Sequence, residues 1–414
     1  MKGGEVPPAP GPLEANASEP LELQAPPPVS EQEVRARQER ARQEAAARGL
    51  SALLVAGRSF YDRVGDLAYL TRHFPPFPAT AHGPGHVAWG HGFLLLPCGT
   101  GPTTLIVDPA GVRPDLAVAD EVLQGTDLAA LLAGALERLR LATGRVGVVG
   151  DDLWPAALRE ALSMRLPALE LVAADDLVRS MRRLKSPAEL ALLRHAAQVA
   201  DRALRAALGA AVPGATERRV SAAGTAAALE GGADFVRYLR VHSGPWSAAG
   251  SRWPPATGRR LEAGELLALD IIGACGGYQF DVLRSTAVGG RAADPERRQL
   301  LEAVLEAVEA SVAQARPGRT CDDVVQAGLS RLAARGLGAH ARTFAGHGIG
   351  LETVEEPWLV AGNRTPLQPG MVLCIEPGCY IPGWGGASIE QEVVVTEGEP
   401  EVITPTPVRL WADP

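Results

Sequence analysis

The sequence predicts two structural domains, an α/β domain followed by an α+β domain with a pseudo-duplicated half. Its 414 residues correspond to two or three domains of ordinary size. From Leu50 onward, short apolar runs alternate with helical stretches, which is typical of an α/β fold. After residue 180, a helical stretch followed by strands occurs twice, and this order indicates a duplicated half.

The first domain is expected over residues 30–179, after a tail over residues 1–29. Proline and small residues dominate the tail and predict disorder. Ser30 followed by Glu33 is a capping box that begins a long helical run. Apolar runs then predict the strands LSALLVAG, HGFLLLP, TTLIVD and RVGVVG, and helical spacing predicts a helix over residues 128–140.

The second domain is expected over residues 180–414, after a hinge at SMRRLKSPA. Ser186 as cap and Pro187 at the first helical position predict a long helix that ends near Ala211. A helix, strands, a second helix and a run of strands follow.

Composition excludes several classes of protein. The 40 basic and 48 acidic residues give a net charge of −8, which disfavours a nucleic-acid binder. Five cysteines without a CxxC pair fit a reducing compartment better than a disulfide framework. The most apolar stretch, residues 266–280, is interrupted by Asp270 and three glycines, so we expect no membrane span and a cytoplasmic protein.

Four histidines lie close together in the first domain. The segments between them, which include FPPFPAT and GPG, are not helices that would align the side chains on one face. We therefore expect loop and surface histidines rather than a metal site at His73, His82, His86 and His91.

Two aspartates mark a predicted hairpin in the second domain. Asp270 ends the run LLALD, and Asp281 follows GGYQF eleven residues later. A turn at Gly276-Gly277 would bring the two carboxylates face to face.

Three further polar residues interrupt apolar strands: His347 in GHGIG, Glu376 in MVLCIEPG and Glu390 in ASIEQEVVV. A carboxylate in such a strand is costly unless it is paired, protonated or bound to metal, and no single basic partner on a nearby strand is evident. Together with the two aspartates they form an oxygen-rich set suited to two divalent ions. The neighbouring Cys374 and Cys379 are expected to be small packing residues.

From about Leu50 to its end, the sequence resembles the pita-bread fold metallohydrolases, namely creatinase, prolidase, aminopeptidase P and methionine aminopeptidase. The resemblance is strongest over LALDIIGACGGYQFDVLRST, FAGHGIGLETVEEP, LQPGMVLCIEPGCY and GGASIEQEVVVTEGE. It implies a creatinase-like α/β domain, a pita-bread catalytic domain and a homodimer. It also implies two divalent ions, with manganese expected before cobalt, zinc or iron, on Asp270, Asp281, His347, Glu376 and Glu390.

The sequence departs from the peptidases of this family at positions that handle substrate. Val354 stands where they carry a second histidine, and Ser388 stands where they carry an arginine. Near the place of another histidine, after SGP, this chain has Ser251 or Trp253. His242 would supply a replacement imidazole, although a satisfied histidine at a strand end is the simpler interpretation.

These patterns lead to three hypotheses about function. The first is a dinuclear metal-dependent hydrolase acting on small peptides as an Xaa-Pro peptidase, with Glu376 as proton acceptor and His242 as a catalytic candidate. The second is a non-peptidase hydrolase or lyase for a small molecule, as creatinase is, with substrate bound by Trp246, Trp253 and Val354. The third is a catalytically silent binding module, which retention of all five ligand positions disfavours.

Overall fold

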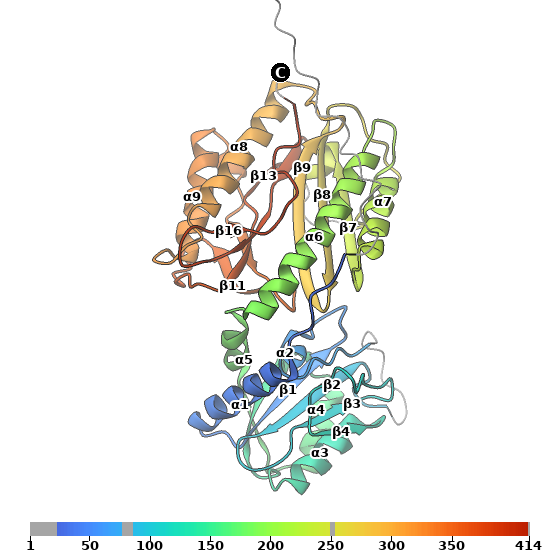
Figure 1. The fold of residues 1–414 in the computed structure, drawn as a ribbon, viewed down its shortest axis with the longest axis vertical. Coiled ribbons are helices and arrows are strands. Elements are labelled where there is room, and N and C mark those ends of the chain that lie inside the picture. The colour runs from blue at the N-terminus through green and yellow to red at the C-terminus, as the bar shows by residue number, and fades with distance from the viewer. Residues whose placement is uncertain (1–22, 77–85, 249–252, 413–414) are drawn as a thin grey trace, which may run out of the picture. The chain divides into compact units, whose positions relative to one another are not determined.

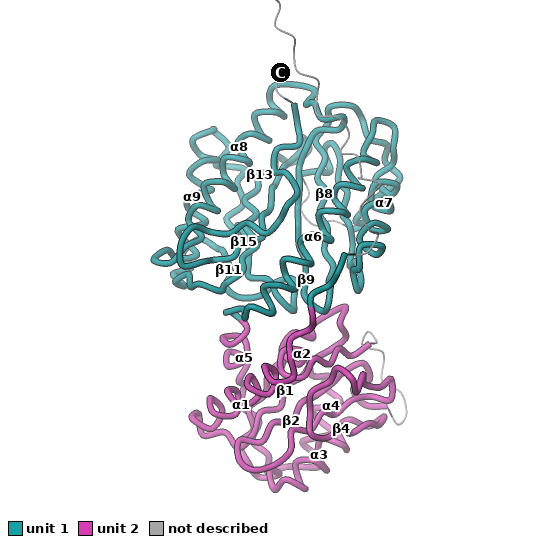
Figure 2. The backbone as a smooth tube through the Cα atoms, in the orientation of Figure 1, with its two compact units in different colours: residues 1–26, 183–414 teal, residues 27–182 magenta. Residues whose placement is uncertain are grey.

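The computed structural model describes residues 23–76, 86–248 and 253–412 (Figure 1). Contacts divide the chain into two compact units, Pro27–Arg182 and Met1–Pro26 together with Arg183–Pro414 (Figure 2). The predicted tail falls mostly outside the described residues, and the predicted domain limits at 30–179 and 180–414 stay a prediction. No helix in the described parts is long and apolar enough to cross a membrane.

The unit Pro27–Arg182 is built on a six-stranded mixed sheet in the order β4-β3-β2-β1-β5-β6. The four strands expected from the sequence are confirmed as β1 Ala52–Arg58, β2 His91–Pro97, β3 Thr104–Val107 and β5 Arg145–Val149. Two short strands complete it, β4 Glu121–Gln124 and β6 Glu170–Ala173. Its α-helices are α1 Glu31–Ala47, α2 Gly65–Thr71, α3 Leu128–Arg138, α4 Ala156–Arg165 and α5 Asp175–Arg182.

The expectation of surface histidines in this unit is wrong for two of them, because His73 is 5% and His91 2% exposed. The ring nitrogens of His91 lie 3.2 Å from the Ala88 carbonyl oxygen and 3.1 Å from the Leu153 carbonyl oxygen. Burial lowers the pKa of His73 to about 4. His82 lies outside the described residues. His73 and His91 are therefore core residues of the α/β unit.

The first half of the other unit is a helix pair packed on a three-stranded sheet. Helix α6 begins with the predicted cap at Ser186, which forms a capping box: the backbone N–H groups of Ser186 and Glu189 each donate to the other's side chain. The elements are α6 Pro187–Ala210, α7 Glu217–Glu230, β7 Phe235–Ser243, β8 Leu266–Cys275 and β9 Tyr278–Ala287, and the sheet order is β7-β8-β9.

The second half repeats this arrangement, with a helix pair followed by strands, and confirms the predicted duplication. Its helices are α8 Pro295–Val312 and α9 Cys321–Ala334. A five-stranded sheet in the order β11-β10-β12-β15-β16 contains β10 Phe344–Gly348, β11 Glu355–Val360, β12 Val372–Ile375, β15 Gln391–Val394 and β16 Glu401–Val402. Strands β13 Gly378–Ile381 and β14 Gly385–Ser388 form a separate hairpin.

Strand alternation gives each sheet an apolar face toward its helices and a second face for the site. In β8, Leu269 and Ile271 join the apolar cluster with α6 and α7, so Asp270 between them faces the other way. In β12, Leu373 and Ile375 join the cluster with α8 and α9. The residues between and after them therefore point away from those helices. The candidate ligands thus lie on the faces that the helices leave uncovered.

Candidate metal centre

The two aspartates lie on the predicted hairpin of β8 and β9. Gly276 and Gly277 form its two-residue turn, and their φ angles of 57° and 80° need residues that tolerate the left-handed region. The pairing register corrects one detail, because Asp270 is opposite Leu283 rather than opposite Asp281. The aspartates are therefore diagonal neighbours on one face, still within side-chain reach of each other.

A basic partner for Asp270 exists, contrary to the expectation from the sequence. Arg240 on β7 is the direct cross-strand neighbour of Asp270. Its Nη1 donates to Asp270 Oδ2 over 2.6 Å, and the two side chains are 18% and 9% exposed. The guanidinium carbon also lies 4.2 Å from the centre of the Tyr238 ring, and Nη2 donates to the Tyr238 hydroxyl. Arg240 is thus held in place beside one oxygen of Asp270.

His347 on β10 presents one ring nitrogen to the carboxylates. Its Nδ1 lies 2.9 Å from the Gly348 carbonyl oxygen, which can only accept, so Nδ1 carries the hydrogen. The other nitrogen, Nε2, therefore keeps its lone pair, and it lies 3.7 Å from Asp281 Oδ2 and 3.9 Å from Glu376 Oε1. Burial lowers the pKa of His347 to about 4, which favours the neutral form that binds metals.

The two glutamates come from the strand ends of the second half. Glu376 directly follows β12, and its backbone N–H donates to the Ala345 carbonyl oxygen over 2.8 Å. Glu390 lies between β14 and β15, and its N–H donates to the Leu283 carbonyl oxygen of β9 over 3.0 Å. This second bond joins the two halves at the site and fixes Glu390 beside Asp281.

The gathered carboxylates fit divalent cations. Asp270, Asp281 and Glu390 each offer an oxygen, and these three oxygens lie within 4.8 Å of one another. Asp270 Oδ1 and Glu390 Oε1 are buried and have no hydrogen-bond partner among the described residues. Burial, and then the neighbouring carboxylates, raise the pKa of Asp281 and Glu390 well above the usual range. Such a set is stable when cations bind it.

A fifth acid lies against this cluster. Glu392 on β15 is fully buried, and its Oε1 accepts a hydrogen bond of 2.9 Å from the backbone N–H of Asp281. Burial raises its pKa to about 8. The sequence analysis did not single it out, although it lies two residues after Glu390 in the same motif.

The predicted substrate residues lie in different surroundings. His242 is 5% exposed and lines a small pocket with Arg240, Asp270, Tyr380 and Ser388. Over the described residues, the lining of this pocket does not include the other candidates. Three of them are exposed, by 46% at Trp246, 87% at Trp253 and 40% at Val354. Ser251 lies outside the described residues.

Arg240 and Arg342 supply positive charge near Ser388, the position at which the peptidases of this family carry an arginine. Ser388 uses its hydroxyl to donate to the Glu376 carbonyl oxygen over 3.1 Å. Arg342, from the segment before β10, places Nη1 3.8 Å from Glu376 Oε2 and lies over the Tyr380 ring. Arg342 and Arg240 were not expected from the sequence, because each reaches the site from a strand or loop distant in the chain.

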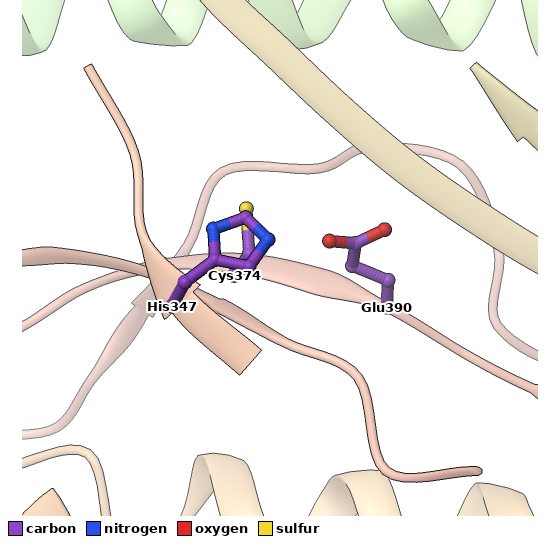
Figure 3. A group of neighbouring side chains, drawn as sticks. All are labelled: His347, Cys374 and Glu390. Carbon is purple, nitrogen blue, oxygen red and sulfur yellow. The ribbon is translucent and has the colours of Figure 1, made fainter. Parts of the chain in front are cut away.

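The two neighbouring cysteines differ. Cys379 belongs to the apolar cluster with α8 and α9, which confirms the prediction of a packing residue. Cys374 instead has its sulfur within 4.8 Å of a nitrogen of His347 and an oxygen of Glu390, and all three residues are buried (Figure 3). The prediction of a packing role is therefore incomplete for Cys374.

Comparisons with known proteins agree with this geometry. Residues 191–397 match the model of metallopeptidase family M24. A probable dipeptidase PepE of Mycobacterium tuberculosis is 34% identical over 316 residues, 71% of this chain and 81% of that protein. An Xaa-Pro dipeptidase of Pyrococcus horikoshii is 31% identical over 256 residues, 62% of this chain and 72% of that protein.

Solved structures show the same fold. The dipeptidase PepE of Mycobacterium ulcerans has a TM-score of 0.75 at 30% identity, covering 93% of this chain and 99% of that one. A prolidase of Pyrococcus horikoshii has a TM-score of 0.78 at 25% identity, covering 91% of this chain and 99% of that one. The two-domain pita-bread fold and the metal-dependent hydrolase class follow from these matches. The chain belongs to metallopeptidase family M24.

Proposed function

We propose that this protein is a dinuclear metal-dependent hydrolase that cleaves the amide bond preceding proline in small peptides. One observation carries the proposal: five ligand side chains from both halves of the unit converge, and two of their buried oxygens have no hydrogen-bond partner among the described residues. The relatives named as dipeptidases and Xaa-Pro dipeptidases support the choice of substrate.

The five side chains would hold two divalent ions, for which we propose manganese. Ions bound there supply a water of lowered pKa and polarise the amide carbonyl. The chain's own contribution is to fix the donors. Hydrogen bonds hold Asp270 through Arg240, His347 through the Gly348 carbonyl and Glu390 through its backbone N–H.

Glu376 is the proposed proton acceptor. Its side chain is 12% exposed, so it lies at the edge of the buried cluster, where substrate can approach. Burial raises its pKa to about 7, against which the positive charge of Arg342 acts. A carboxylate at this edge can accept a proton from water and return it to the leaving nitrogen.

His242 and Arg240 are the proposed substrate-handling groups. Both line the pocket beside Asp270, where an imidazole and a guanidinium can donate to a substrate oxygen. In this proposal they take over part of the role of the histidines that Val354 and Ser251 replace. Trp246 and Trp253 offer exposed rings for apolar contact with the substrate side chain.

A second candidate function is hydrolysis or lysis of a small non-peptide molecule. The observation that favours it is Val354, which contributes no hydrogen-bond donor and is 40% exposed. A peptide that relies on a donor at this position would be held less well here, while a smaller substrate would not need it.

Metal analysis and a substrate panel test these alternatives. We expect two equivalents of divalent metal in the purified protein, and cleavage of Xaa-Pro dipeptides but not of small amides or betaine-like compounds. The matched control is Asp281→Asn, which keeps the side-chain volume and removes the charge. Activity confined to the small compounds would select the second candidate, and a protein without bound metal would support a silent binding module.

We also propose that the protein is a cytoplasmic homodimer. The support is the resemblance to the creatinase, prolidase and aminopeptidase P branch, in which dimers are common. Light scattering at micromolar concentration gives the mass directly. A monomeric mass would contradict this part of the proposal.

A further inference from the structure

Cys374 occupies a central place among the ligand-bearing strands. In β12 it is the direct cross-strand partner of His347 on β10 and of Glu392 on β15. Directly opposed residues project from the same face of a sheet, and so do residues two apart in one strand. Its thiol therefore lies on the face that carries His347, while Leu373 and Ile375 pack toward α8 and α9.

The donor atoms around this thiol lie close to the spacing that one bound ion requires. The Cys374 sulfur, a nitrogen of His347 and an oxygen of Glu390 lie within 4.8 Å of one another. Donors around one tetrahedral ion are about 3.3–3.8 Å apart, given bonds of about 2.3 Å to sulfur and about 2.0 Å to nitrogen or oxygen. Binding an ion here would draw the three donor atoms toward one point from a spacing of at most 4.8 Å.

The donor atoms of His347 and Glu390 are already directed into the space between these two side chains and Cys374. In Figure 3 a ring nitrogen of His347 points toward the Glu390 carboxylate, and the sulfur of Cys374 lies beside the same ring. Glu390 is 1% exposed, and its Oε1 has no hydrogen-bond partner among the described residues. The thiol donates a long hydrogen bond of 3.9 Å to the Asp281 carbonyl oxygen. Metal binding would therefore break only a weak hydrogen bond of this thiol.

A buried cysteine that only packs looks different in this protein. Cys379 is equally buried, but its neighbours are the apolar residues of the cluster with α8 and α9. Over the described residues, the groups of side chains close enough to hold an ion include Cys374 and do not include Cys379. Burial is thus common to both cysteines, and the surrounding donors separate them.

We propose that Cys374 is a sulfur ligand of the metal centre, on the side shared by His347 and Glu390. The inference rests on the metal centre of the proposed function. On binding, the S–H bond breaks, its proton leaves to solvent and a metal–sulfur bond forms, without any change of oxidation state. The ion held by Cys374 would be a borderline one such as cobalt, zinc or ferrous iron, because thiolate suits these better than manganese. The proposal of manganese then applies to the other ion of the pair.

Cobalt binding gives a direct spectroscopic test. The full-length protein is stripped with a chelator and titrated with Co²⁺, and the near-ultraviolet absorption is recorded for the sulfur-to-cobalt charge-transfer band. We expect the band in the unmodified protein and in Cys379→Ser, and its absence in Cys374→Ser. Cys374→Ser should also weaken cobalt binding by on the order of tenfold or more, with a smaller effect on manganese.

Each outcome of this experiment decides the point. Two bound cobalt ions without the band, or a band that survives Cys374→Ser, would overturn the sulfur ligand and leave the proposed function intact. Failure of the unmodified protein to bind cobalt while it still binds manganese would overturn the sulfur ligand alone, and failure to bind either metal would overturn both proposals. If Cys374→Ser does not fold, X-ray absorption at the zinc edge of the unmodified protein decides instead, through the presence or absence of a sulfur neighbour.

Discussion

Replacing Arg240 by methionine should make the centre bind divalent metal more tightly. Arg240 donates to Asp270 Oδ2 over 2.6 Å, while the other oxygen of Asp270 is buried and has no hydrogen-bond partner within the described parts of the chain. Methionine keeps an unbranched side chain beside the Tyr238 ring and removes the charge. The metal-free protein should lose stability, because one carboxylate of the cluster then lies buried without its cation.

The direction follows from comparing two opposed effects. With an ion on Asp270 Oδ1 taken to lie roughly 5 Å from the guanidinium, a charge of two repels a charge of one by about 7 kcal/mol at an effective dielectric constant of 20. Losing a group that orients a metal ligand costs about 10- to 100-fold in affinity, or roughly 1–3 kcal/mol. Repulsion is the larger effect by about 4 kcal/mol or more, so we expect affinity to rise by on the order of 1,000-fold.

Competition with a coloured chelator measures this affinity, and thermal denaturation of the metal-free forms measures the cost in stability. Arg240→Lys keeps the charge and should bind metal nearly as the unmodified protein does. Arg237→Met, at an exposed position of the same strand, is the matched control and should change neither quantity. Metal binding that weakens 10- to 100-fold in Arg240→Met would refute the reasoning and identify Arg240 as an orienting group first.

Three further outcomes are expected. Asp281→Ala should abolish metal binding and turnover, and two tightly bound ions found by elemental analysis of this variant would exclude it as a ligand. Val354→His, at a 40% exposed position, should raise Xaa-Pro cleavage by about tenfold or more if a donor is missing there; efficient cleavage that the substitution leaves unchanged would contradict this. Burial raises the pKa of Glu376 to about 7 and of Glu392 to about 8, so in the metal-free protein both hold protons that the unfolded chain releases above its ordinary pKa of 4.5. The melting temperature of the metal-free protein should therefore fall as pH rises from about 6.5 to 8, a range above the ordinary pKa of His73 and His347, whose buried neutral rings oppose the trend at lower pH. Bound metal should remove this slope, and a metal-free protein that is most stable at pH 8 would disprove the raised pKa values of the two glutamates.

The ligand positions could be predicted because each violates the pattern around it. Asp270 and Glu390 are acids within apolar strand sequences, and such acids need a partner that the local sequence does not provide. The paired glycines at 276 and 277 also predicted the turn that joins β8 and β9. Both patterns involve residues that are close in the sequence, so they can be recognised without knowledge of the tertiary structure.

What could not be predicted depends on register and on packing between distant segments. Arg240 lies 30 residues before Asp270, and only the pairing of β7 with β8 places the two side by side. For Cys374, a small residue in an apolar strand is compatible with packing and with metal binding alike. The burial of His91 could not be predicted for a related reason, because its partners are carbonyl oxygens that no sequence pattern reveals.

The proposed ligands come from both halves of the duplicated unit, which would have a consequence for how the protein acquires its metal. Asp270 and Asp281 come from the first half, and the other three ligands come from the second. Neither half alone carries the full proposed set, so a cation bound by it would act as a cross-link that forms only after both halves have folded and docked. A chain ending before Glu390 would contain a properly paired β8–β9 hairpin and still lack the centre. Metal occupancy therefore reports the completeness of the whole unit, and loss of the metal is an early sign that the halves have separated.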